Sequence, residues 1–559
     1  MTAGEWLERL GEPGAGAQPA LSSVYGPNPE VLSCRLELLR KTIAKHLERF
    51  GDGPLGLFRC PGRVNLRGMH VDTHGGYLNL MTHQREVVVA ARPVSDDRVV
   101  VANIDPRFEE VAFGIDEFSQ HGAFQENWLT FITHPDVQNR VLAQRGHWGN
   151  YLKGAVLSAR HRHGNATCNG FHAVVGSDLP RGAALSSSTA LSVAVFLAAQ
   201  GCNGLSLDDE SLILAVKDAE WYTGARGGIS DQSAMILGGR DELVNAALLS
   251  SDLDTSTARR AQFPDELRVL VINSHTERSL SGAQLVEYTR NRFAYSLAMA
   301  IIRQEMKAQG VDETLLAHAD RLAHLSPMFF EELGGASFLY RLLQRIPDEI
   351  DLDELRARYD LPELDAAYEQ YFGTAPPELR PTRIGLRGPL LFGIAESERA
   401  RLFIEVLQQG NFARTGRLMS AGHDGDRRVR RDGTAFSFDC SHDALEQAIV
   451  RGTPIELLPG AYGASSPVLD TLVDTALDAG ALGASLTGAG IAGAVLALCR
   501  REDVDGVASA VRERLASEDY ARIAKWDAPL AQDQLEEAVI ENHAPAAAGE
   551  LVLTGSGGL

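Results

Sequence analysis

The stretch GSDLPRGAALSSSTALSVA, residues 176–194, joins a polar turn, a few small residues and a run of three serines to the start of an apolar helix. Small side chains let a backbone approach an anion closely, and successive N–H groups and a helix N-terminus attract negative charge. The stretch therefore predicts a phosphate-binding loop. It also fits a plain serine N-cap on a buried helix, so its surroundings have to distinguish the two.

The segments around this loop have the order that a phosphate loop needs. A strand is predicted at 170–175, before the loop, and a helix after it. The chain has no GxxxxGK[ST] motif, which excludes the common P-loop. GAGIAG at 488–493 matches GxGxxG, but the strand AVLALC at 494–499 follows where a dinucleotide site requires a helix. We interpret this glycine run as a hairpin suited to an active-site wall.

A second stretch, PGRVNLRGMHVDTHGGYLNL at 61–80, is dense in polar groups and glycines. A carboxylate and an imidazole can share the hydroxyl groups of a sugar, so Arg63, His70 and Asp72 indicate a concave site for a hydroxyl-rich ligand. Two other interpretations stay open. His70 and His74 have the HxxxH spacing of a metal site, although the glycines after His74 discourage the helix that this spacing needs. The stretch also fits a polar surface turn.

A third stretch, residues 212–239, holds two carboxylates next to a glycine run. Glu220 lies near the end of a predicted helix at 212–222, and Asp231 follows Gly224, Gly227 and Gly228. A carboxylate in a tight turn beside a phosphate loop is typical of the base of a kinase. Asp231 could instead be the N-cap of a helix at 232–237.

Length and charge favour small-molecule chemistry. The 559 residues can form two or three domains, and 44% hydrophobic with 23% charged residues is ordinary for a globular protein. A net charge of −21 argues against nucleic acid and against an anionic membrane as partners. RRVRR at 427–431 is the one dense basic cluster, and it fits a solvated loop or a contact to an anionic substrate. The sequence does not distinguish a monomer from a dimer.

Cysteine spacing and the N-terminus predict a cytoplasmic protein. The six cysteines are scattered, with no CxxC pair, which is typical of reduced thiols. The first residues, MTAGEWLERLGEPGAG, lack the apolar core of a signal peptide, and no apolar run reaches the ~18 residues of a membrane span.

Hydrophobic periodicity predicts further elements along the chain. A loose leader is expected at 1–24, a mixture of acidic helices (347–372) and loop at 326–440, and a disordered tail at 541–559. The predicted helices are 28–50, 148–163, 212–222, 282–309, 313–325 and 468–479. The predicted strands are 55–58, ending at a turn at 60–62, then 85–93, 98–101, 267–273 and 484–487.

These motifs together resemble those of the GHMP kinases, most closely the galactokinase branch. Residues 61–76 are similar to PGRVNLIGEHTDYNGG, 179–191 to PxGxGLSSSAA, 219–238 to AEHxxxGxxCGIMDQ, and 486–498 to LTGGGFGGCVVAL. The resemblance implies an α+β fold of two domains. Residues 25–245 would form an N-terminal domain of the ribosomal-protein-S5-like type, with a mixed sheet and helices. Residues 246–540 would form a C-terminal α/β sandwich domain, with an insertion at about 313–400.

The resemblance also implies an ATP-dependent sugar 1-kinase that uses Mg²⁺. Asp231 falls on the catalytic aspartate and Arg63 on the arginine that assists the attacking hydroxyl. Ser188 and Glu220 fall on Mg²⁺ ligands, whose oxygen chemistry suits that ion. The implied ATP-binding residues are Gly182, Ala183, Ala184, Leu185, Ser186, Ser187 and Ser188. The implied sugar-binding residues are Arg63, Met69, His70, Asp72, Gly228, Asp231 and Tyr288.

Departures from the family pattern concern the acceptor. Met69 replaces a glutamate that grips the hydroxymethyl end of galactose, and a thioether cannot do so; plain galactose is therefore not the expected substrate. Thr73 and His74 reshape the same pocket, and Tyr288 stands three residues later than the family's tyrosine.

Two other functions remain compatible with the motifs. The first is a non-catalytic sensor of sugar and ATP, although the serine run that such proteins are expected to lose is whole in this chain. The second is a kinase of a non-sugar alcohol such as homoserine or mevalonate, although His70 and Asp72 suit a polyol.

Overall fold

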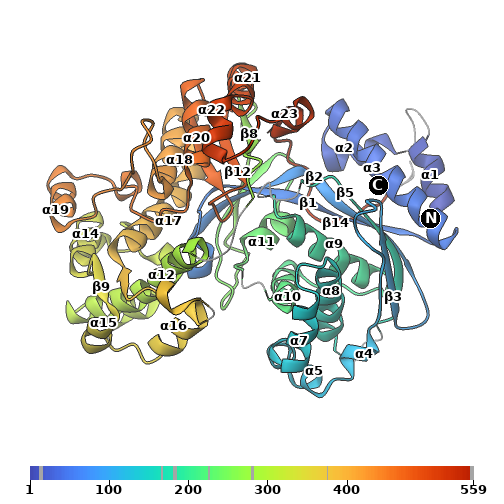
Figure 1. Ribbon diagram of the computed structural model, residues 1–559, viewed down its shortest axis with the longest axis horizontal. Helices are drawn as coiled ribbons and strands as arrows, with labels where there is room; N and C mark the ends of the chain where they lie inside the picture. The colour runs from blue at the N-terminus through green and yellow to red at the C-terminus, as the bar shows by residue number, and fades with distance from the viewer. Residues whose placement is uncertain are drawn as a thin grey trace.

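The computed structural model describes residues 1–11, 17–164, 168–180, 185–224, 227–277, 283–373 and 375–553, with the backbone alone at 283–285, 287 and 288. It contains two main sheets, one of eight strands and one of four (Figure 1). The predicted two-domain α+β architecture is confirmed, and the first sheet is mixed because β3 and β5 pair in parallel while its other pairs are antiparallel.

The first sheet has the order β14-β1-β2-β5-β3-β4, and β6 and β7 extend from the start of β2. Its long central strand is buried on both faces. Val87 and Val89 of β2 pack into one apolar cluster with helices α8, α9 and α10, whereas Val88 packs into another with α1 and α3. The strands are β1 (Gly56–Arg67), β2 (Tyr77–Pro93), β3 (Arg98–Asn103), β4 (Val111–Gly114), β5 (Phe171–Ser177), β6 (Glu242–Ala247), β7 (Arg259–Gln262) and β14 (Gly549–Glu550). The helices are α1 (Ala3–Gly11), α2 (Gln18–Tyr25), α3 (Pro29–Phe50), α4 (Asp116–Ser119), α5 (Gly122–Glu126), α6 (Trp128–Thr133), α7 (Pro135–Ala143), α8 (Gly149–Arg162), α9 (Ser187–Gly201), α10 (Asp209–Tyr222) and α11 (Ser230–Leu237).

The second sheet has the order β11-β12-β8-β13, and helices α20 and α21 pack on it. Helices α12 to α16 form a separate group below it in Figure 1, around the two-stranded sheet β9-β10. The strands are β8 (Leu267–Asn273), β9 (Glu349–Asp351), β10 (Arg383–Gly385), β11 (Gly483–Thr487), β12 (Ala494–Arg500) and β13 (Val539–Glu541). The helices are α12 (Ala283–Ala308), α13 (Glu313–His318), α14 (Ala336–Arg345), α15 (Leu352–Arg358), α16 (Leu364–Phe372), α17 (Arg387–Gln408), α18 (Phe412–Asp426), α19 (His442–Arg451), α20 (Pro467–Asp478), α21 (Val504–Leu515), α22 (Glu518–Ala524) and α23 (Gln532–Ala538).

Strand β1 corrects the predicted turn at residues 60–62. The strand continues through Pro61 to Arg67, with a shift of register against β2 between Pro61 and Gly62. A bulge of this kind accommodates a proline inside a strand, which the sequence pattern alone did not indicate. Arg63 and Asn65 consequently lie two residues apart on one strand.

Helices α17 and α18 correct the predicted loop character of 326–440. Helix α17 packs against β2 and α18, and α18 packs against β11, so the pair bridges the two sheets. Most of α17 is buried, including Glu396, Glu398 and Arg399. Because charged residues occupy buried positions, the sequence of this helix lacks the amphipathic pattern that would have predicted it. The expected end of the insertion, residue 400, falls inside this helix.

The described residues near both ends of the chain pack into the fold, which corrects the expected leader at 1–11 and 17–24 and the expected tail at 541–553. Trp6 of α1 is 3% exposed, and its indole Nε1 donates to the Leu55 carbonyl at 3.0 Å. At the other end, the Pro545 carbonyl accepts from Thr82 Oγ1 at 2.6 Å, and Leu551 is buried. Residues 554–559 lie outside the described residues. Burial of a few apolar side chains outweighs the Gly, Ala and Pro composition that suggested disorder.

Helices in the described part of the chain are all too short or too polar to cross a membrane.

His83 of β2 should make the protein lose stability in acid. The ring is fully buried beside Asn542, and burial lowers its pKa to about 4. The unfolded chain has the ordinary pKa of about 6.5, so unfolding near pH 5 takes up a proton and stability falls as the pH drops from 6.5 toward 4. We expect His83→Gln to reduce the slope of unfolding free energy against pH by about 1.4 kcal/mol per pH unit in that window. Urea unfolding at several pH values measures it. His442→Gln, at an exposed histidine, should leave the slope unchanged, and equal slopes in all three proteins would contradict the expectation.

Candidate active site

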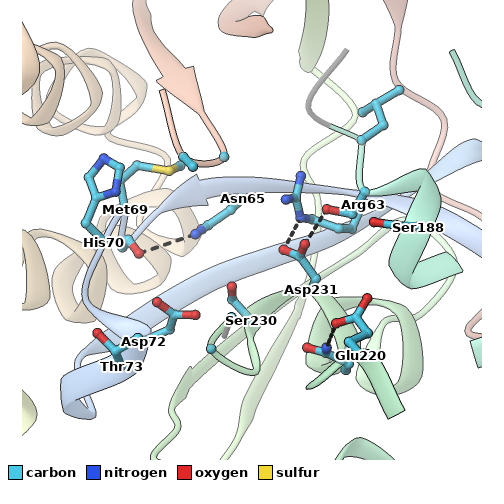
Figure 2. A pocket seen from close by; sticks show the side chains of 18 of the residues that line it. Arg63, Asn65, Met69, His70, Asp72, Thr73, Ser188, Glu220, Ser230 and Asp231 are labelled. Atoms are coloured by element: carbon cyan, nitrogen blue, oxygen red, sulfur yellow. Dashed lines mark hydrogen bonds and ion pairs between the residues drawn. The ribbon is translucent and has the colours of Figure 1, made fainter. Parts of the chain in front are cut away.

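A cleft of about 580 Å³ collects residues from both halves of the chain. Figure 2 shows Arg63, Asp231, Ser188 and Glu220 toward one end of it and Met69, His70, Asp72 and Thr73 toward the other. The predicted residues that line the cleft are Arg63, Met69, His70, Asp72, Leu185, Ser186, Ser187, Ser188, Glu220, Gly228 and Asp231. Gly182, Ala183 and Ala184 lie outside the described residues, and so does the side chain of Tyr288, whose backbone is part of α12.

Hydrogen bonds hold both oxygens of the Asp231 carboxylate in the cleft. Its Oδ1 accepts a hydrogen bond from Arg63 Nε at 2.7 Å, and its Oδ2 accepts one from Ser186 Oγ. The side chain is 29% exposed, so a ligand in the cleft can reach it. Asp231 lies in the first turn of α11, whose N-cap is Ile229, so the N-cap interpretation is wrong. The two bonds fix the orientation of a carboxylate that a ligand in the cleft can reach.

The serine run does not cap its helix in the ordinary way. Ser186 occupies the N-cap position of α9 with a left-handed φ of 55°, and its hydroxyl makes no capping bond but donates to Asp231. A non-glycine residue in this conformation costs about 1–2 kcal/mol, and such strain concentrates at functional sites. Ser187 and Ser188 follow it into the cleft lining. The local geometry thus favours the phosphate-loop interpretation over a plain cap.

Glu220 and Ser188 offer oxygen donors beside Asp231. Glu220, at the end of α10, accepts from Thr189 Oγ1 at 2.6 Å and from Gln232 Nε2. Burial raises the pKa of Glu220 to about 8; its two hydrogen bonds and Arg63 oppose this, whereas the charge of Asp231 adds to it. A carboxylate and a hydroxyl, with room for waters and phosphate oxygens, fit the preferences of Mg²⁺.

Without Mg²⁺, Glu220→Gln should stabilise the protein at alkaline pH. The folded-state pKa lies above the ordinary value of about 4.5, so Glu220 lowers stability progressively as the pH rises from 4.5 to 8. A glutamine removes this effect, and its amide can pair with the unpartnered Oε1 of Gln232. We expect a Tm a few degrees higher than that of the parent at pH 8.5.

The pH series contains its own control. The difference in Tm should be much smaller at pH 5, where Glu220 is largely protonated in the folded state and about one quarter protonated in the unfolded state. A variant that is less stable at pH 8.5, or shifted equally at both pH values, would contradict the assignment.

His70 and Asp72 line the other end of the cleft. The His70 ring stacks on Tyr462 with centroids 4.4 Å apart, and its Nε2 lies 3.5 Å from Asp426 Oδ1. Asp72 packs so closely on Gly228 that a Cβ there would lie 2.0 Å from Asp72 Oδ2. The glycine is therefore required for the position of this carboxylate.

Met69 contributes an apolar wall. Its side chain is 2% exposed and packs in the cluster of the second sheet, with Ala484 and Leu486. A thioether at this position offers no strong hydrogen bond to a ligand.

A metal site at His70 and His74 is not supported. His74 pairs with Ser296 Oγ at 3.2 Å, and burial, aided by Arg292, lowers its pKa to about 4. Within the described ranges, the one cluster with ligand spacing is elsewhere, at His121, His134 and Asp136.

Part of the lining was not predicted from the sequence. Asn65 lies two residues after Arg63 on β1, so the two side chains point to the same face of the sheet. Asn65 was not predicted because the strand was expected to end at residue 58. Arg292 and Tyr295 lie one helical turn apart on α12 and also line the cleft, as does Tyr462. The glycine run was predicted correctly, because Gly488, Ala489 and Ala492 form part of the wall. The basic cluster 427–431 lies outside this lining, and Arg427 pairs with Asp474.

Family models match three parts of the chain. The N-terminal domain of the GHMP kinases matches residues 150–239, the C-terminal domain matches 436–517, and the galactokinase galactose-binding signature matches 44–93.

Relatives match along most of the chain. A galactokinase from Chloroflexus aurantiacus is 28% identical over 464 residues, covering 83% of this chain and 88% of the relative. One from Roseiflexus sp. is 28% identical over 470 residues, covering 84% and 88%. Among solved structures, Lactococcus lactis galactokinase in complex with galactose has a TM-score of 0.58 at 20% identity, covering 91% of this chain and 98% of that one, which supports the fold.

Proposed function

The chain belongs to the GHMP kinases, among the galactokinase-like ATP-dependent sugar kinases, and we propose that it phosphorylates the anomeric hydroxyl of a monosaccharide to give a sugar 1-phosphate and ADP. The observation that carries the proposal is the Asp231 carboxylate, which Arg63 and Ser186 hold in the cleft that Ser186, Ser187 and Ser188 share with His70 and Asp72.

Asp231 accepts the proton of the attacking hydroxyl in this proposal. The bond from Arg63 Nε fixes the carboxylate and keeps a positive charge close to the site of phosphoryl transfer. Positioning and charge neutralisation are what this reaction chiefly needs. The hydroxyl of Ser186 holds the second carboxylate oxygen, so that the first turn of α9 and the base are fixed to each other.

In this proposal, ATP binds to the loop at residues 182–188. Ser188 and Glu220 would hold Mg²⁺, which would neutralise phosphate charge when bound. Thr189 and Gln232 orient the Glu220 carboxylate for this role through their hydrogen bonds.

The acceptor lies between Arg63 and the end of the cleft that Met69, His70, Asp72 and Gly228 line. The family resemblance adds Tyr288 to the proposed sugar ligands. Asp72 offers an acceptor for sugar hydroxyl groups. The buried thioether of Met69 supports a substrate other than plain galactose, because no carboxylate is available at that position.

A panel of pentoses, hexoses, 6-deoxyhexoses, uronic acids and heptoses with ATP and Mg²⁺ tests the proposal through ADP release. At least one sugar should give turnover well above the ATP-only background. Turnover with none of them would overturn it, and calorimetric binding of sugar and ATP without ADP release would identify a sensor instead.

A further inference from the structure

Glu396 of α17 holds the backbone of the sugar loop from behind the cleft. Its Oε1 accepts hydrogen bonds from the backbone N–H groups of Gly68 at 2.7 Å and Met69 at 3.1 Å. The side chain is fully buried and lies outside the cleft lining. A residue more than three hundred positions away in the chain thus fixes the two peptide groups that precede His70.

Two buried arginines neutralise this carboxylate. Arg399 Nε donates to Glu396 Oε2 at 2.7 Å, and Arg67 Nε lies 3.5 Å from Oε1. Burial alone would raise the pKa of Glu396, but the two guanidinium groups and these hydrogen bonds lower it below its ordinary value. A buried charge persists in a fold only when it is paired and hydrogen-bonded, and all three of these side chains are at most 1% exposed.

The two arginines also connect Glu396 to α18 and to the segment around Leu458. Arg67 Nη1 donates to the Met419 carbonyl of α18 at 2.8 Å, and Arg399 Nη1 donates to the Leu458 carbonyl at 2.8 Å. Gly422 leaves the space for the guanidinium, since a Cβ there would lie 1.7 Å from Arg67 Nη1.

The loop needs such support. His70 has a left-handed φ of 62°, which is unfavourable for a residue with a Cβ. Furthermore, the family-like pattern PGRVNLIGEH has an apolar residue and a carboxylate at the positions of Arg67 and Met69. In this chain Arg67 and Met69 stand at those positions, and the carboxylate that reaches the loop is that of Glu396 on α17.

We propose that Glu396 is a positioning residue for the acceptor end of the cleft, acting through the backbone of residues 68–70. An amide in place of the carboxylate has only one oxygen, so either Arg399 Nε or the peptide groups of Gly68 and Met69 lose their acceptor. The strained His70 then relaxes, and His70 and Asp72 leave the positions that face the acceptor. The part of this inference that concerns the acceptor rests on the proposed function.

Two substitutions on α17, Glu396→Gln and Glu398→Gln, test the proposal. Glu396→Gln should speed hydrogen exchange of peptides covering 64–72 at least tenfold and raise the acceptor KM at least tenfold, with the ATP KM within twofold of the parent. Glu398→Gln is the matched control, because Glu398 is also buried on α17 but pairs with Arg401. Glu398→Gln should change the exchange rate at 64–72 and the acceptor KM by no more than twofold.

Equal effects of the two variants, or unchanged exchange at 64–72 in Glu396→Gln, would overturn the positioning role. The exchange measurement needs no substrate, so it remains decisive even if the sugar panel gives no turnover. A loss of acceptor affinity in both variants together with a loss of ATP affinity would assign Glu396 to general stability only, which also overturns the proposal.

Discussion

Asp231→Asn should lower kcat about a thousandfold, because loss of a positioned general base commonly costs 10²–10⁴ in rate. The asparagine keeps the size of the side chain and can still accept from Arg63 Nε through its Oδ1. The KM values for ATP and for the acceptor should therefore stay within about threefold, and the Tm within a few degrees. Steady-state ADP release with the acceptor found in the panel measures the effect.

Asp218→Asn is the control for this prediction. Asp218 lies on α10, pairs with Arg162 and does not line the cleft. Its amide should leave kcat within twofold of the parent. If Asp231→Asn retained more than a tenth of the parental kcat, Asp231 would not be the base.

Gly228→Ala should raise the acceptor KM at least tenfold. The added Cβ would lie 2.0 Å from Asp72 Oδ2, so the carboxylate or the glycine turn has to move. The shift removes a hydroxyl ligand from the acceptor end while the serine loop and Asp231 stay in place, so the ATP KM should remain within twofold. Initial rates at varied acceptor and ATP concentrations separate the two constants.

Gly227→Ala is a closely matched control, because Gly227 also lines the cleft but a Cβ there would lie within 4 Å of no atom of the described residues. It should leave the acceptor KM nearly unchanged. Similar increases in both variants would assign the effect to the stiffness of the turn and not to the position of Asp72.

Local patterns predicted the motifs and most elements well. Strand β8 was expected at 267–273 and lies at Leu267–Asn273, and the strand–loop–helix order around Ser186 is present because apolar runs and turn residues determine it locally. The motifs predicted that one site contains Arg63, Asp72, Ser188, Glu220 and Asp231. All five line the cleft.

The elements that the sequence did not predict depend on contacts between distant segments of the chain. The expected leader is anchored by the hydrogen bond from Trp6 to the Leu55 carbonyl, and the expected tail by the bond from Thr82 to the Pro545 carbonyl. Helix α17 was hidden because its buried charges have partners elsewhere in the chain, as Glu396 has in Gly68. Such pairings are not encoded in any short window of sequence, and they also determine how the acceptor end is built.

Phosphorus-31 NMR of the reaction mixture tests most directly whether Asp231 drives phosphorylation of an anomeric hydroxyl. The protein would be incubated with ATP, Mg²⁺ and the sugars of the panel, with Asp231→Asn in parallel. We expect a sugar phosphate signal coupled to an anomeric proton, formed one-to-one with ADP by the parent and nearly absent with the variant. ADP formation with inorganic phosphate alone, or a sugar phosphate formed equally by both proteins, would contradict this function.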